Sequence, residues 1–162
     1  MSCIEIYPGY NVPLKRYKNF ITKLEQMMST INPDEHPKQL IICHSIGIID
    51  YLLQHPQLQQ NKLIVSIDGT DLHLEDPQQM KDDNYDKWKQ WKALEKSEDF
   101  KLPNIILFYP KNKIRNDLKA DEKNYISPYY KYVFLYPEKG GHYPFYDKDS
   151  QNIIIQKIRE LL

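Results

Sequence analysis

The sequence predicts an α/β fold with three layers, in which helices cover a mainly parallel sheet of five strands. Short apolar runs rich in Ile, Leu, Val and aromatic residues alternate along the chain with longer amphipathic stretches. Runs of this kind are typical of strands that are buried on both faces of a parallel sheet. The length of 162 residues is suited to one core, so we expect a single domain over residues 1–162.

The apolar runs are bounded by polar, Pro or Gly residues, which end strands. The five expected strands are 3–7, 39–44, 62–67, 104–109 and 131–136. If they lie in chain order and are joined by right-handed crossovers, the intervening helices fall on one face of the sheet. The other face would then be covered by the C-terminal helix alone, and such an apolar face favours a homodimer.

Helices are expected between the strands. Between the first two strands, Tyr17, Phe20, Leu24 and Met28 recur at helical spacing and form one apolar stripe. A second helix follows Ser45 and stops before Pro56 because a residue that precedes proline disfavours helical geometry. Further helices are expected over 84–97 and 150–162, with a short one between the last two strands.

Composition excludes several classes of protein. Lys plus Arg and Asp plus Glu are both 22, so the formal net charge is zero. A balanced charge disfavours a nucleic-acid partner or a polybasic membrane patch. No run of roughly 18 apolar residues predicts a membrane span. The two cysteines cannot form a disulfide framework and no signal peptide is visible, so we expect a reducing, cytoplasmic setting.

A serine stands between an expected strand and an expected helix, in the segment QLIICHSIGIIDYLL at 39–53. On a sharp turn of this kind, the hydroxyl of Ser45 would be exposed at the carboxyl edge of the sheet. The close approach of the backbones there requires small residues two positions before and after the serine. Cys43 and Gly47 meet that requirement.

A histidine follows the last expected strand, in the segment EKGGHYPFYD. The pair Gly140 and Gly141 permits the backbone angles of a tight loop, which could hold the imidazole of His142 over the sheet. Since the strands are parallel, this is the same edge that carries Ser45.

Together these segments resemble a minimal α/β-hydrolase fold. CHSIG resembles its nucleophile elbow, GGHYPF resembles its histidine loop, and the serine precedes the histidine as in that family. YPGYNVP resembles the oxyanion loop, although it lacks the histidine that usually precedes the glycine. The resemblance implies that the backbone N–H groups of Tyr10 and Ile46 form an oxyanion hole. The five strands are fewer than that family usually has.

A catalytic triad also needs a carboxylate beside the histidine. The resemblance places it after the strand that precedes the histidine strand, but position 113, where it commonly falls, is a lysine. Asp117 is the first choice, because a slightly longer loop could still reach His142. The alternative is Asp68, after the strand 62–67, where some lipases of the family carry the acid; an ordinary Asp-Gly turn would also explain this residue.

The sequence therefore predicts a serine hydrolase that cleaves a small-molecule carboxylic ester or thioester through an acyl-enzyme intermediate, using Ser45, His142 and Asp117. This chemistry requires no metal and no organic cofactor. A hydrolase-like fold without activity, serving as a binding or assembly module, is the alternative. Acyl transfer to an alcohol or amine is not distinguished from hydrolysis by the sequence.

Overall fold

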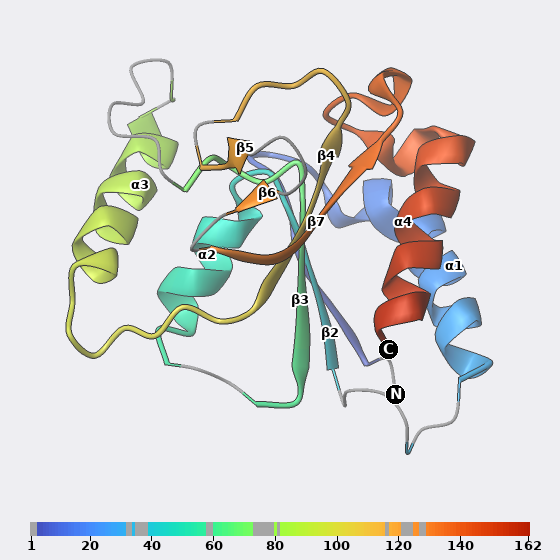
Figure 1. The fold of residues 1–162 in the computed structure, drawn as a ribbon, viewed down its shortest axis with the longest axis horizontal. Coiled ribbons are helices and arrows are strands. Elements are labelled where there is room, and N and C mark those ends of the chain that lie inside the picture. The colour runs from blue at the N-terminus through green and yellow to red at the C-terminus, as the bar shows by residue number, and fades with distance from the viewer. Residues whose placement is uncertain are drawn as a thin grey trace.

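A computed structural model describes residues 3–31, 34, 39–57, 60–72, 80, 82–115, 117–120, 125–126 and 129–162. Its centre is a five-stranded sheet in which every neighbouring pair of strands is parallel (Figure 1). The strands are β1 (Ile4–Tyr7), β2 (Gln39–His44), β3 (Lys62–Ile67), β4 (Ile105–Pro110) and β7 (Tyr130–Tyr136), and they lie in that order. The predicted sheet is confirmed.

Within the described residues, four α-helices pack on the sheet in two layers. They are α1 (Lys18–Ser29), α2 (Gly47–Gln54), α3 (Asp82–Glu95) and α4 (Lys148–Leu161). In Figure 1, α1 and α4 lie on one side of the sheet, and α2 and α3 lie on the other. The predicted three-layer α/β architecture is therefore confirmed.

The sheet divides the buried side chains into two hydrophobic clusters. Along β2, Leu40 and Ile42 face the layer of α1 and α4, while Ile41 and Cys43 face the layer of α2 and α3. This alternation follows from the two-residue period of a strand. All four side chains are fully buried, which explains why this strand is a continuous apolar run in the sequence.

The expectation that the intervening helices share one face is wrong for α1. The apolar stripe of α1, which includes Phe20 and Leu24, packs in the same cluster as Ile154 and Ile158 of α4. The crossovers from β1 to β2 and from β2 to β3 advance in the same direction across the sheet but use opposite faces. They therefore have opposite hands, and one of them departs from the right-handed rule.

This arrangement has a consequence for assembly. Each face of the sheet is covered by two helices, so a second copy of the chain is not needed to cover an apolar face. In the described part of the chain, the sheet face left to one helix, on which the expectation of a homodimer rested, is not found.

The chain between β4 and β7 also differs from expectation. In the described part of residues 111–129 there is no short helix; instead β5 (Lys119–Ala120) and β6 (Tyr125–Ile126) form a small antiparallel pair. Three 3-10 turns complete the described elements: Leu14–Tyr17, Glu138–Gly140 and Pro144–Tyr146. Among the described helices, none has the length and apolar character required to cross a bilayer.

Candidate active site

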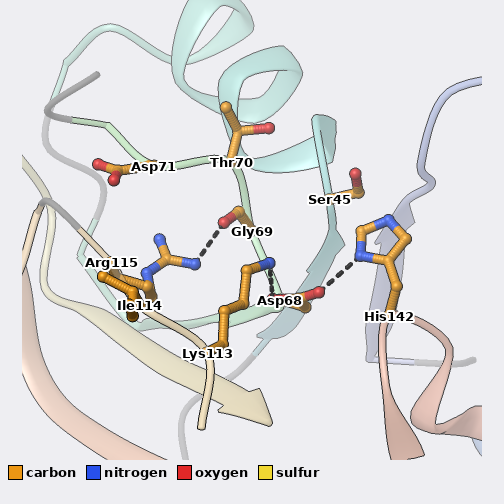
Figure 2. A pocket seen from close by; sticks show the side chains of 9 residues that line it. All are labelled: Ser45, Asp68, Gly69, Thr70, Asp71, Lys113, Ile114, Arg115 and His142. Atoms are coloured by element: carbon orange, nitrogen blue, oxygen red, sulfur yellow. Dashed lines mark hydrogen bonds and ion pairs between the residues drawn. The ribbon is translucent and has the colours of Figure 1, made fainter. Parts of the chain in front are cut away.

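The carboxyl ends of the strands bring polar side chains to one edge of the sheet. Ser45 follows β2, Asp68 follows β3 and His142 comes from the loop after β7. These three residues line a pocket of about 190 Å³ (Figure 2). The pocket is completed by Gly69, Thr70, Asp71, Lys113, Ile114 and Arg115.

Ser45 occupies a sharp turn between β2 and α2. Its φ of 57° lies in the left-handed region, which non-glycine residues rarely adopt. The turn is held because the Ser45 N–H donates to the carbonyl of Ile67 at 3.2 Å and the Ser45 carbonyl accepts from the Thr70 N–H at 3.1 Å. Strained residues of this kind gather at functional sites, where the surrounding structure holds them in place.

The requirement for small residues around this turn has a direct structural cause. A Cβ atom on Gly47 would lie 2.0 Å from the carbonyl oxygen of Tyr7, so only glycine allows the start of α2 to pass the end of β1. On the other side of the serine, the Cys43 side chain is fully buried. The segment therefore runs from a buried strand through a strained serine into a helix whose first residue is a glycine.

The loop after β1 passes directly beside the serine. A Cβ atom on Gly9 would lie 3.3 Å from Ser45 Cβ and 3.1 Å from His44 Nδ1. Ile46, the N-cap residue of α2, has an N–H for which the described residues supply no backbone acceptor. Neither Tyr10 nor Ile46 belongs to the residues that line the pocket, so their role as oxyanion donors stays a prediction.

His142 is oriented by a buried carboxylate. Its Nδ1 lies 2.6 Å from Oδ2 of Asp68, whose side chain is only 2% exposed. A carboxylate accepts hydrogen bonds, so Nδ1 carries the proton and Nε2 of the neutral ring is left with a lone pair. Figure 2 shows this second nitrogen on the side of the ring that faces Ser45. Within the described residues no hydrogen bond joins Ser45 Oγ to His142, and such bonds are often long in the absence of substrate.

Asp117, the first choice from the sequence, is not the carboxylate beside His142. It receives two hydrogen bonds from Arg115, from Nε at 2.9 Å and from Nη2 at 2.8 Å, together with bonds from the Tyr130 hydroxyl and the Leu72 N–H. Arg115 also donates to the Gly69 carbonyl at 2.6 Å. Asp117 is therefore the counter-ion of a buried arginine, and the carboxylate beside His142 is that of Asp68.

Lys113 donates a hydrogen bond to the second carboxylate oxygen of Asp68. Its Nζ lies 2.5 Å from Oδ1, while Oδ2 accepts from His142. Burial alone would raise the pKa of Asp68, but the hydrogen bonds from His142 and Lys113 outweigh it and lower this pKa below its usual value. Asp68 is therefore ionised at neutral pH. Its φ of 42° is also in the left-handed region.

A second histidine connects the loops of the site. The Gly9 N–H donates to Tyr17 Oη at 3.0 Å, Tyr17 Oη lies 2.7 Å from His44 Nδ1, and His44 Nε2 lies 2.6 Å from the His142 carbonyl. Burial lowers the pKa of His44 to about 4, so its ring is neutral. The carbonyl needs a donor, so Nε2 carries the proton and Nδ1 accepts from the Tyr17 hydroxyl.

These hydrogen bonds connect three segments: the loop after β1 that contains Gly9, strand β2, and the loop after β7 that contains His142. Sequence reasoning missed Tyr17 and Lys113 as parts of the site. Tyr17 had the signal of a core residue in a helical stripe, and Lys113 was noticed only as a position that lacks the acid.

Comparison of the chain with protein-family models, with curated proteins and with solved structures found no match. In the part of the chain that the structure describes, no three His, Cys, Asp or Glu side chains form a group suited to a metal ion.

Proposed function

We propose that the protein is a serine hydrolase that cleaves a small-molecule carboxylic ester or thioester. The observation that carries this proposal is the position of His142, which is held at Nδ1 by a buried, ionised Asp68 and shares its pocket with a strained serine. Three groups in this arrangement can activate a nucleophile: a serine at the end of a strand, a histidine that accepts its proton, and a buried carboxylate that orients the histidine.

In the proposed reaction, Ser45 Oγ forms a bond with the acyl carbon while its proton passes to Nε2 of His142. Asp68 keeps the imidazole in the reactive tautomer and stabilises its protonated form. The N–H groups of Tyr10 and Ile46 are the proposed donors to the tetrahedral oxyanion. The leaving alcohol or thiol takes the proton from Nε2 as its bond to the acyl carbon breaks. Water then releases the acyl group by the same steps, so no cofactor is needed.

The pocket supports small, polar substrates. Its volume is about 190 Å³, and its one large aliphatic lining residue, Ile114, is 91% exposed. A long fatty acyl chain would find little apolar surface to bury there, and burial of CH₂ groups is what gives such chains their affinity. The proposed substrates are therefore esters and thioesters with short acyl groups. The free cysteines Cys3 and Cys43 support a reducing, cytoplasmic setting.

The alternative of an inactive binding module has three observations behind it: the lysine at position 113, where the resemblance places the acid, the missing histidine of the oxyanion loop and the small number of strands. The contact of Asp68 with His142 answers the first of them. Asp68 supplies a carboxylate to His142 from the neighbouring strand instead.

Initial rates on p-nitrophenyl and thiophenyl esters test the proposal. We expect hydrolysis of acetate to exceed that of octanoate in kcat/KM. Ser45→Ala should abolish the activity, and Asp68→Asn should lower kcat by about 10³–10⁴-fold because the imidazole loses its orienting charge. The exposed serine at position 97 provides a matched control, since Ser97→Ala should not change the rate. A folded wild-type protein with no activity on any of these esters would contradict the proposal.

A further inference from the structure

The carboxylate of Asp68 is shared between two cationic partners. Its Oδ2 faces Nδ1 of His142 at 2.6 Å, and its Oδ1 faces Nζ of Lys113 at 2.5 Å. A triad carboxylate acts on the histidine through its negative charge, so a lysine on the same carboxylate alters what the histidine experiences. Lys113 follows β4, and Asp68 follows the neighbouring strand β3, so the sheet itself brings them together.

The ion pair is buried at its aspartate end and open to solvent at its lysine end. An ion pair that is exposed at both ends contributes little free energy, because water weakens the attraction between its two charges. Here the Asp68 side chain is 2% exposed, although that of Lys113 is 40% exposed. Figure 2 shows the amino group of Lys113 turned toward Asp68.

Other charged and titratable groups around His142 come from several elements of the fold. His44 from β2 is the neutral ring of the hydrogen-bonded chain, at 4.8 Å between ring centroids. Arg115 is compensated by Asp117. The remaining neighbours are Asp71, which lines the pocket, the phenol of Tyr143 next in the chain, and the phenol of Tyr136, which donates to the Gly141 carbonyl. Lys113 is thus the cation that acts most directly on the Asp68–His142 pair.

We propose that Lys113 is a positioning residue that fixes the Asp68 carboxylate and weakens the affinity of the His142 imidazole for a proton. The inference rests on the proposed function. A nearby positive charge disfavours the imidazolium and offsets part of the anionic field of Asp68. His142 must be neutral to accept the proton of Ser45, so Lys113 extends activity toward lower pH.

The test compares the pH–rate profile for ester hydrolysis in wild type, Lys113→Met and Lys113→Arg. Removal of the charge should move the acid limb of the kcat/KM profile to higher pH by about half a unit to one unit, whereas the arginine variant should keep the wild-type limb. Lys111→Met removes an exposed charge two residues away and should also leave the limb in place. Lys113→Gln is a second neutral variant should Lys113→Met fail to fold.

A parallel NMR titration of the His142 Cε1–H signal gives a readout that does not need activity. Its midpoint should rise in Lys113→Met by the same amount as the acid limb. If the wild type hydrolyses no ester, the proposed function fails, and the NMR midpoint still decides whether Lys113 acts on His142. An unchanged midpoint, or a loss of rate that is equal at every pH, overturns the role proposed for Lys113.

Discussion

Two aspartates near the candidate site have different roles, and their surroundings assign them. Asp68 bonds to His142 and Lys113 at the edge of the pocket, whereas Asp117 is bonded to Arg115 and Tyr130 in the interior. From the sequence, Asp117 was the first choice for the acid and Asp68 the alternative, whereas the structure places Asp68 beside His142. Distance along a loop could not show that Arg115, two residues away, would need Asp117 as its counter-ion once buried.

Asp117→Asn should destabilise the fold. The substitution leaves the guanidinium of Arg115, whose side chain is 2% exposed, without its carboxylate partner. Loss of one partner from a buried ion pair costs about 3–5 kcal/mol. Urea unfolding at neutral pH measures this change in the free energy of unfolding. The exposed Asp99→Asn serves as the control and should change it little; equal stability of the two variants would contradict the assigned role.

His44 should make stability depend on pH. Its pKa is lowered from 6.5 to about 4 by burial, so as pH falls the unfolded state binds a proton before the native state does. Stability contributed by neutral His44 is complete above pH 6.5 and is lost as pH falls toward 4, by about 3 kcal/mol. Urea unfolding across this range should show the loss in wild type, and the slope should be smaller in His44→Gln. Identical slopes in the two proteins would contradict it.

At the scale of elements, the junctions between strands and loops build the site. Strand β2 could be predicted from a run of apolar residues, and helix α2 from apolar residues that recur at helical spacing. Both patterns are local in the sequence. The reason for Gly47 was not visible in the sequence, since it depends on the carbonyl of Tyr7 at the end of another strand. The short β5–β6 pair was missed because strands of two residues have no periodic pattern.

Gly47→Ala tests the close contact between the elbow and β1. The added methyl group would lie 2.0 Å from the Tyr7 carbonyl oxygen, and backbone cannot move aside as a side chain can. We expect a loss of stability of about 1–3 kcal/mol or more, as for other overpacked sites. The urea midpoint measures it, and a midpoint equal to that of wild type would show that the backbone approach is looser than described.

At the scale of the whole molecule, a parallel sheet gathers the ends of its strands at one edge, and this is why residues far apart in the chain meet. That convergence of Ser45 and His142 could be predicted from strand order alone. The face occupied by α1 could not be predicted, because the right-handed rule places α1 and α2 on the same face of the sheet. Tyr17, which is bonded to His44 and Gly9, is one contact that holds the start of this helix on the α4 side.

The identity of the nucleophile can be measured directly. Intact-mass and peptide mass spectrometry after incubation with a fluorophosphonate probe should show one adduct, on Ser45, because this hydroxyl stands on the strained turn after β2 and shares a pocket with the oriented imidazole of His142. Labelling should be lost in Ser45→Ala and strongly slowed in His142→Gln. A folded wild-type protein that takes up no label, or that is labelled equally well without Ser45, would contradict the central claim that Asp68 and His142 activate this serine.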